Sequence, residues 1–363
     1  MGKKLIFTVI NDTNYDQRMI RICNSLAAAG YDVLLIGRKP GKSIPLIKQS
    51  FRQVRLKTIF SHGFLLYAFF NIQLFFWLLF QKADLICAID LDTILPCYFI
   101  SRLKRIKRVY DAHELFCEMK EIVTRPAIYK FWKRIEKFSV PAFINGYTVN
   151  KIIAKEFNKM YGVEYEVIRS IARLEAFTPG KKDSPFIIYQ GAVNEGRSFE
   201  TLIPAMQWVD VPLVICGDGN FMENARALVK KYKLEEKVIF KGKIPPGELK
   251  LFTRTAAIGV TLFDDTGISN YWSLSNRFFD YIHAGIPQLC VDYPAYKEIN
   301  NLYETAVLVK DLSPPNIAMQ LNELLNNTEL YNKLAANCVQ AAQLLNWQQE
   351  EKKLVALYKK ILS

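Results

Sequence analysis

The chain has 363 residues, half of them hydrophobic, and a formal net charge of +13. This length fits two domains of ordinary size, each with enough apolar residues for its own core. The positive charge is confined to one half: residues 1–175 carry 28 Lys and Arg against 15 Asp and Glu, whereas residues 176–363 carry 20 of each. No nucleic-acid-binding motif accompanies this excess, so we expect an acidic ligand or an anionic membrane surface and no nucleic acid.

The cysteines and the most apolar segment indicate the cellular compartment that we expect for the protein. The seven cysteines form no CxxC pair and mostly lie in apolar runs, as reduced, buried thiols of a cytoplasmic protein do. The first ten residues are typical of a strand rather than of a signal peptide. The apolar run at 64–80 contains Asn71 and Gln73, and its 17 residues fall just short of a membrane span. We therefore expect a buried or partly membrane-facing helix there.

The first half of the chain alternates short apolar runs with segments of helical periodicity. This order predicts a parallel sheet with crossover helices, hence a doubly wound α/β domain. The first strand-to-helix turn, NDTNYDQR, has no GxGxxG and so disfavours a dinucleotide-binding dehydrogenase. The strands are expected at 4–10, 31–37, 83–89, 108–110, 146–149 and 165–168, and the helices at 16–29, 64–80, 94–103, 128–139 and 151–161.

A stretch rich in Pro, Gly and Lys at 169–185 is the best candidate linker, and the alternation restarts after it. We predict domains at 1–175 and 185–345, with residues 346–363 as a terminal helix. The strands of the second domain are expected at 186–190, 212–216, 237–240, 258–262, 288–291 and 306–309, and the helices at 199–206, 222–232, 247–254, 275–284, 315–326, 329–345 and 347–362.

The clearest ligand-binding pattern lies at 266–290, where a polar loop leads into the helix expected at 275–284. Ser273 or Ser275 can cap the start of this helix, and Gly285 stands where it ends. The first N–H groups of a helix lack partners inside it, and the helix dipole favours negative charge there. The start of this helix is therefore a candidate phosphate site.

Three polar side chains of this helix share one side, because residues three and four apart are neighbours on a helix. They are Asn276, Arg277 and Asp280. A cation near the start and a carboxylate one turn deeper suit a nucleotide diphosphate, with Arg277 at the phosphates and Asp280 at the ribose hydroxyls. The alternative is an amphipathic helix with a surface Arg–Asp pair, and spacing alone does not separate the two.

The segment 273–287, SLSNRFFDYIHAGIP, resembles the donor-site segment of the family 4 type (group 1) retaining glycosyltransferases, S-x-P-N-K-x-x-E-Y-x-x-A-G-x-P. Ser275 replaces the common Pro, Asp280 replaces the second Glu of the family pattern, and Trp272 stands where its first Glu falls. That Glu contacts the donor sugar. The resemblance therefore implies that the contact comes from elsewhere, such as the backbone amides of Asn270 to Ser273.

This resemblance extends over nearly the whole chain and implies the GT-B fold, two Rossmann-like domains facing across a cleft with the last helix crossing back to the first. It implies a nucleotide-diphosphate sugar as co-substrate, no metal or other cofactor, and retention by same-face attack assisted by the leaving phosphate. The acceptor would be a glycan or a lipid-linked sugar, in cell-surface polysaccharide or glycolipid synthesis. Two alternatives stay open: a sugar-nucleotide epimerase on the same fold, and a non-catalytic GT-B binding subunit, which Trp272 motivates.

Two glycine-containing turns follow predicted strands of the second domain. In the turn from Gly191 to Arg197, backbone can approach a phosphate and Arg197 can neutralise it. Gly196 and Arg197 look like the family's diphosphate-binding element, and the turn with Gly217 and Gly219 lies beside the nucleotide in the family. The alternatives are a surface arginine after a turn, and a strand-to-helix turn that needs glycine for a positive φ.

Acidic residues and one histidine stand at predicted strand ends of the first domain, where α/β proteins bind ligands. His113 lies between Asp111 and Glu114 and can donate to a hydroxyl of the donor sugar or help to position the acceptor. The alternative is a histidine satisfied by the neighbouring carboxylates. Asp90 and Asp92 could offer paired-carboxylate chemistry, but their near-adjacency favours solvated loop ends.

The first strand-to-helix turn of the first domain gathers further polar residues. Together with Glu114, we assign Asn14, Asp16 and Arg18 to the acceptor side of the cleft. The alternative is helix capping by Asn14 or Asp12, with Asp16 in the first turn, and capping can coexist with binding.

Two groups of cations flank the aromatic run at 64–80. We interpret this arrangement as a surface that docks on an anionic membrane, at the inner face of the cytoplasmic membrane. The alternative is a core helix beside a solvated basic face. The cations are Arg52, Arg55 and Lys57 before the run, and Arg102, Lys104, Arg105, Lys107 and Arg108 after it.

Overall fold

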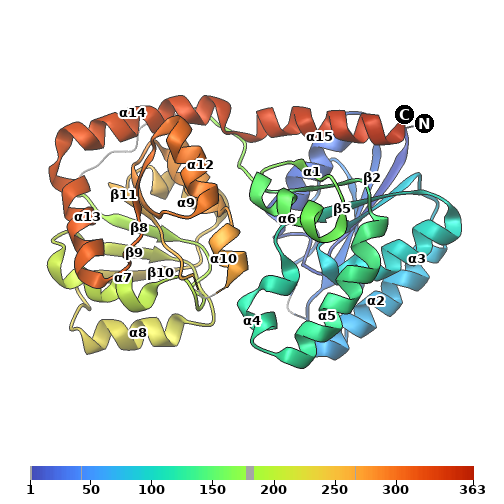
Figure 1. Ribbon diagram of the computed structural model, residues 1–363, viewed down its shortest axis with the longest axis horizontal. Helices are drawn as coiled ribbons and strands as arrows, with labels where there is room; N and C mark the ends of the chain where they lie inside the picture. Colours follow the sequence, from blue (N-terminus) through green and yellow to red (C-terminus); the bar gives the residue numbers. More distant parts are fainter. Residues whose placement is uncertain (1, 42, 177–183, 266) are drawn as a thin grey trace. The chain divides into compact units, whose positions relative to one another are not determined.

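A computed structural model describes residues 2–41, 43–176, 184–265 and 267–363. The chain divides into two compact units: unit 1 comprises residues 1–170 and 350–363, and unit 2 comprises residues 171–349 (Figure 1). The sequence places these boundaries near 175 and 346. The linker expected at 169–185 lies in part, at 177–183, outside the described residues.

Unit 1 is built on a seven-stranded parallel sheet in the order β3-β2-β1-β4-β5-β6-β7. Its central strands β1 and β4 are buried except at Lys4 and consist mainly of apolar residues, as expected for a parallel sheet with helices on both faces. The strands are β1 Lys4–Thr8, β2 Asp32–Lys39, β3 Arg52–Lys57, β4 Leu85–Ile89, β5 Lys107–Ala112, β6 Gly146–Thr148 and β7 Glu166–Val167. The helices are α1 Gln17–Ala28, α2 Gly63–Leu79, α3 Ile94–Lys104, α4 Lys120–Val123, α5 Pro126–Ser139 and α6 Lys151–Tyr161, with short 3-10 turns at Leu91–Thr93, Phe116–Glu118 and Val140–Ala142.

Unit 2 repeats the plan with a six-stranded parallel sheet in the order β10-β9-β8-β11-β12-β13. The strands are β8 Ile187–Gln190, β9 Leu213–Cys216, β10 Val238–Gly242, β11 Ile258–Thr261, β12 Gln288–Val291 and β13 Ala306–Val309. The helices are α7 Phe199–Ala205, α8 Met222–Lys231, α9 Pro246–Thr253, α10 Ile268–Trp272, α11 Asn276–Ala284, α12 Pro294–Tyr303, α13 Pro314–Asn326 and α14 Thr328–Leu344, with a 3-10 turn at Met206–Trp208. The two doubly wound parallel sheets confirm the predicted fold class.

Several local expectations are corrected by tertiary contacts. The polar loop expected before α11 contains a helical turn, α10. Helix α1 is capped by Asp16, whose carboxylate accepts from the Met19 amide at 3.0 Å, and not by Asn14 or Asp12. Asn14 is used elsewhere, since its amide group binds backbone atoms of the loop at 44–47.

The last helix, α15 (Trp347–Leu362, red in Figure 1), supplies side chains to the core of unit 1. Tyr358 is fully buried, with its ring 5.9 Å from that of Phe7 and 6.3 Å from that of Tyr147. The buried Glu350 accepts from the Arg169 amide at 3.0 Å and lies 3.2 Å from its guanidinium. The predicted return of the terminal helix to the first domain is thus confirmed.

The apolar helix α2 spans Gly63–Leu79. Among the described residues, no helix is both long and apolar enough to cross a membrane. All seven cysteines are buried free thiols.

We predict that Tyr358→Ala lowers the free energy of unfolding of unit 1 by about 3–5 kcal/mol, the usual cost of deleting a buried aromatic side chain. Hydrogen exchange of the β1 amides measures this free energy for unit 1 alone. Lys359→Ala, at the exposed neighbouring position, is the matched control and should change it by less than about 0.5 kcal/mol. A loss below about 1 kcal/mol for Tyr358→Ala would show that α15 contributes little to this core.

Candidate active site

Arg277 in the first turn of α11 is the central side chain of the site in unit 2. It is only 7% exposed, and its guanidinium carbon lies 4.3 Å from the centre of the Tyr189 ring and 5.0 Å from that of Phe263. Its Nε donates to the Ser275 hydroxyl at 3.2 Å. Its Nη1 is buried and has no hydrogen-bond partner among the described residues. A buried cation with an unused donor is suited to bind an anion.

The start of α11 adds to this preference for negative charge. Ser275 occupies the N-cap position, but its side chain makes no capping hydrogen bond because it accepts from Arg277 instead. The amide of Ser275 donates to the Tyr296 hydroxyl at 2.9 Å. Ser275, one of the two residues expected to cap the helix, is therefore its N-cap residue but makes no capping hydrogen bond, and the start of the helix dipole lies next to Arg277.

The loop after β8 brings a second arginine to the same aromatic ring. The Arg197 guanidinium carbon lies 4.6 Å from the centre of the Phe263 ring, and its Nη1 is 3.4 Å from the Asn270 side-chain oxygen. Gly191 has φ +118°, and a Cβ added there would lie 3.9 Å from the guanidinium carbon of Arg277. The two arginines and this glycine therefore come together at the carboxyl ends of β8 and β11, the edge where parallel sheets bind ligands.

The remaining glycines have a packing reason for their identity. A Cβ at Gly196 would lie 2.9 Å from the side-chain nitrogen Nδ2 of Asn270. A Cβ at Gly217 would lie 1.8 Å from the carbonyl oxygen of Gly191. A Cβ at Gly219 would lie 2.3 Å from the Val193 carbonyl oxygen. Gly217 and Gly219 thus allow two turns to lie in contact, and this contact shapes the loop that carries Gly191. Glycine is required there because a side chain would clash, and not only because of the backbone φ angle.

Asp280 lies one turn beyond Asn276 on α11 and is tied to the sheet. Its Oδ2 accepts from the Gln190 side-chain amide at 2.9 Å, and the Gln190 oxygen accepts from the Thr253 hydroxyl at 2.7 Å. This chain orients the carboxylate at the end of β8. A role at a ribose stays a prediction.

Helix α10 includes residues that were expected to offer free backbone amides, those of Asn270 to Ser273, to the donor sugar. The Tyr271 amide donates to Gly267 and the Ser273 amide donates to Asn270, so these two groups are used within the turn. The Ser273 hydroxyl also donates to the Asn270 carbonyl, at 2.8 Å. The Tyr271 and Ser273 amides therefore do not supply the contact that the missing Glu makes in the resembling family.

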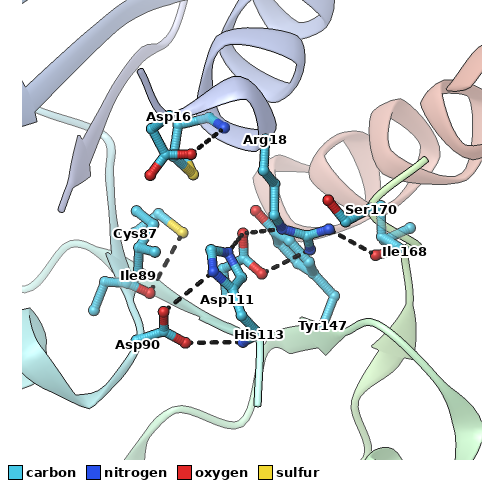
Figure 2. Close-up of polar contacts among 12 residues, drawn as sticks. Asp16, Arg18, Cys87, Ile89, Asp90, Asp111, His113, Tyr147, Ile168 and Ser170 are labelled. Carbon is cyan, nitrogen blue, oxygen red and sulfur yellow. Dashed lines mark hydrogen bonds and ion pairs between the residues drawn. The ribbon is translucent and has the colours of Figure 1, made fainter. Parts of the chain in front are cut away.

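A second polar site lies in unit 1, at the carboxyl ends of the neighbouring strands β4 and β5 (Figure 2). The His113 ring lies between two carboxylates, with Nδ1 3.1 Å from Asp90 and Nε2 3.2 Å from Asp111. Arg18 binds the far side of Asp111 through Nε at 3.2 Å and Nη2 at 2.8 Å, and its Nη1 donates to the Ile168 carbonyl. Two basic and two acidic side chains thus alternate in one cluster, with Arg18 and Asp111 buried and His113 and Asp90 partly exposed.

The charges of this cluster fix one another. Burial alone would lower the pKa of His113, but the carboxylates of Asp90 and Asp111 raise it well above its usual range, which favours the imidazolium form. Burial would raise the pKa of Asp111, and Arg18 with His113 lowers it to about 2. Both ring nitrogens face carboxylates, but Nε2 makes no hydrogen bond among the described residues, so a role of His113 at a sugar hydroxyl stays a prediction.

Asp92 is buried, although the sequence analysis expected Asp90 and Asp92 at solvated loop ends. Its Oδ1 is buried without a hydrogen-bond partner among the described residues, and burial together with the negative charge of Asp90 raises its pKa well above the usual range. Asp90 itself has φ +52°, a backbone conformation that non-glycine residues adopt at a cost and that recurs at functional sites. Asp90 lies directly after the buried strand β4, and its carboxylate pairs with His113.

The acceptor-side residues are mostly used inside unit 1. Arg18 is 6% exposed and fully engaged by Asp111 and Ile168, so it does not reach an acceptor directly. Asn14 holds the loop at 44–47 and Asp16 caps α1. Glu114 stays partly exposed beside His113. Sequence reasoning did not identify Tyr189 of β8 or Phe263, which follows β11, because aromatic residues in or near an apolar strand give no signal of the arginines that stack on them.

With this geometry described, the chain can be compared with known proteins. It is similar to a sucrose-phosphate synthase from Thermosynechococcus elongatus, at 17% identity over 99% of both chains with a TM-score of 0.79. HepE of Anabaena, solved with UDP-glucose, is 12% identical over 99% of this chain and 100% of its own, with a TM-score of 0.76. The glycosyltransferase WaaG is 14% identical over 97% and 99%, with a TM-score of 0.74. No curated protein sequence matches the chain.

These likenesses define the fold as that of the GT-B glycosyltransferases. Residues 172–343, which make up nearly all of unit 2, match the family model of the glycosyl transferases, group 1. This part of the chain is therefore similar to the group 1 glycosyltransferases. The resemblance of the segment 273–287 is confirmed at the level of the family.

We predict that the His113 ring carries a proton on both nitrogens at pH 7.5, as histidine carbon and nitrogen NMR shifts would report. Because its pKa is raised, its attraction to the two carboxylates is complete below pH 6.5 and is lost only as pH rises through the raised value. His283 is the internal control, since burial lowers its pKa and it should be neutral at pH 7.5. Asp90→Asn should move the His113 titration to lower pH. Titration of wild-type His113 near 6.5 would contradict this account.

Proposed function

We propose that the enzyme transfers a sugar from a nucleotide-diphosphate sugar to a glycan or lipid-linked acceptor, with retention of configuration, in the synthesis of a cell-surface polysaccharide or glycolipid. The buried Arg277, with its unused Nη1 at the start of α11, carries this proposal. The solved complexes of HepE with UDP-glucose, and of TarM with UDP and a glycerol glycoside, support it by analogy. WaaG, described as acting in lipopolysaccharide biosynthesis, supports the acceptor class.

In the proposed reaction, the two arginines stabilise the negative charge that develops on the leaving diphosphate. As the bond from the sugar C1 to the diphosphate oxygen breaks, negative charge grows on the leaving group, next to Arg277, Arg197 and the start of α11. Donors fixed at such a point stabilise the transition state more than the ground state. The acceptor oxygen then bonds to C1 from the same face, and its proton passes to an oxygen of the leaving phosphate.

Two rigid cations can supply this stabilisation without a divalent ion. Arg277 is held by Tyr189 and Ser275, and Arg197 is held by Phe263 and Asn270, so neither needs to reorganise when charge appears. We therefore propose that turnover is independent of metal. In unit 1 we propose that His113 positions Asp90 at the acceptor edge, and that Glu114 lies at the same edge.

The first test is nucleotide affinity, screened by thermal shift with UDP, GDP and ADP, since a ligand of the folded state raises the unfolding temperature. Arg277→Met should weaken the preferred nucleotide by about tenfold to a hundredfold, the loss expected for one charge-assisted hydrogen bond. Arg226→Met is the matched control, because Arg226 also stacks on a ring of unit 2, that of Phe240 at 4.6 Å. Wild-type affinity in Arg277→Met would refute the phosphate assignment.

The second test concerns metal and stereochemistry. Turnover of the preferred nucleotide sugar should persist in excess EDTA, and proton NMR of the first product should show the anomeric configuration of the donor. Loss of activity in EDTA that Mn²⁺ or Mg²⁺ restores would contradict metal independence. A product of inverted configuration would contradict same-face attack, while leaving the assignment of Arg277 to the diphosphate intact.

A further inference from the structure

Helix α2 presents an unusual surface to solvent. None of its seventeen residues is charged, and one side of it is buried through Leu66, Phe70, Leu74 and Leu78. The opposite side is also apolar, with Leu65, Ile72 and Phe76 being 56%, 59% and 57% exposed. A helix that is apolar all round is normally buried in protein or in lipid, and this one is only half buried in the protein.

The apolar surface continues onto α3 and α5, which lie beside α2 (Figure 1). The Phe64 ring of α2 is 5.5 Å from the Phe131 ring of α5, and these side chains are 64% and 45% exposed. Further along α5, the Phe138 ring is 6.3 Å from the Phe99 ring of α3, and these side chains are 53% and 46% exposed. We call this surface the α2–α3–α5 face.

One side of α5 adds positive charge to this face. Lys130, Arg134 and Lys137 are exposed and spaced by four and three residues, so they form one stripe along the helix. The only acidic residue of α5, Glu136, is buried and bound by Lys133. The cationic stripe therefore has no acidic neighbour on its own helix, and it runs next to the exposed Phe131 and Phe138.

Several of the cations that the sequence analysis assigned to membrane docking have partners within unit 1. Among the cations after α2, Lys104 donates to carbonyls at the end of α2, Lys107 donates to the Ile361 carbonyl, and Arg108 stacks on Tyr98. Before α2, Arg52 pairs with Asp32 and Arg55 pairs with Asp12. These five side chains make contacts within unit 1, so reversing their charges would test its stability as well as docking.

We propose that the α2–α3–α5 face docks on the surface of a bilayer that contains anionic lipids. The apolar side chains enter the boundary between headgroups and acyl chains, while Lys130, Arg134 and Lys137 meet the anionic headgroups. This combination of an apolar face and a neighbouring cationic stripe is how interfacial helices bind without spanning. The charge complementarity selects an anionic bilayer over a second copy of this chain, whose own face would bring the same cations together.

The docking face is connected to the polar site of unit 1. The Asn71 side-chain amide of α2 donates to the Asp92 carbonyl at 2.8 Å, in the loop that also carries Asp90. The Tyr67 ring of α2 packs on Trp132 of α5, whose ring in turn contacts Phe116, three residues after His113. A docked α2–α3–α5 face thus holds the Asp90–His113 edge close to the membrane, which deepens the proposed function by favouring a membrane-borne acceptor.

The experiment is co-sedimentation of the full chain with vesicles of phosphatidylcholine alone or with 30 mol % phosphatidylglycerol, at low and high salt. Binding should require the anionic lipid and weaken with salt, because headgroup attraction is screened within a Debye length. Ile72→Gln with Phe76→Gln, and separately Lys130→Glu with Arg134→Glu and Lys137→Glu, should each lower the partition coefficient by roughly tenfold or more. All five positions are exposed, so the fold should persist.

The matched controls lie in unit 2. Leu251→Gln with Leu302→Gln removes equally exposed apolar side chains, and Lys230→Glu with Lys231→Glu and Lys243→Glu reverses as many exposed charges. Both should bind vesicles like the wild type. Equal binding to neutral and anionic vesicles, no binding at low salt, or a self-associated wild type that Ile72→Gln with Phe76→Gln dissociates would each overturn the proposal. Nucleotide affinity of the same variants should be unchanged, so failure of docking leaves the transferase assignment standing.

Discussion

The guanidinium of Arg277 is a charge buried between two aromatic rings, with one donor left unused among the described residues. Burying a charge without a counter-charge costs several kcal/mol, and a cation–π contact offsets only part of it. The surrounding unit is arranged to tolerate this cost: Ser275 accepts from the arginine instead of capping its helix, and Gly191 has no side chain that could fill the space beside it. A bound phosphate would relieve both the charge and the uncapped helix start at once.

Arg18 in unit 1 is a second buried arginine, and its hydrogen-bond partners differ from those of Arg277. Arg18 is as buried as Arg277, yet it donates to both oxygens of Asp111 and to the Ile168 carbonyl. Its charge is cancelled within unit 1, and the surplus partner of Asp111, His113, is cancelled in turn by Asp90. Burial of an arginine therefore does not mark a ligand site by itself. The distinction lies in whether the protein supplies the anion: Asp111 does so for Arg18, whereas Nη1 of Arg277 has no hydrogen-bond partner among the described residues.

Much of the architecture could be predicted from the sequence because inner strands such as β4 and β9 are continuous apolar runs and the helix ends carry local signals. The edge strand β3, RQVRLK, contains no such run and is absent from the predicted strands. The end of α11 is an example, since Gly285 adopts φ +67° and makes the left-handed turn that its position predicts. Capping was harder, because Asp12, Asn14 and Asp16 are all competent caps, and Asp12 and Asn14 are taken up by Arg55 and by the loop at 44–47. The burial of Asp92 and the helical turn of α10 likewise depend on contacts made by distant segments, which no local pattern contains.

The charge of the first half shows a different limit of sequence reasoning. A surplus of Lys and Arg is a property of a segment, whereas attraction to a surface requires the side chains to be exposed on one face. In the run Arg102 to Arg108, the cations that look most concentrated include three that bind carbonyls or stack on a ring. The three on α5 are spaced along a helix and attract less notice in the sequence, but they are exposed and stand beside exposed aromatic side chains. Three-dimensional placement, and not the local density of charge, decides which cations can meet an anionic partner.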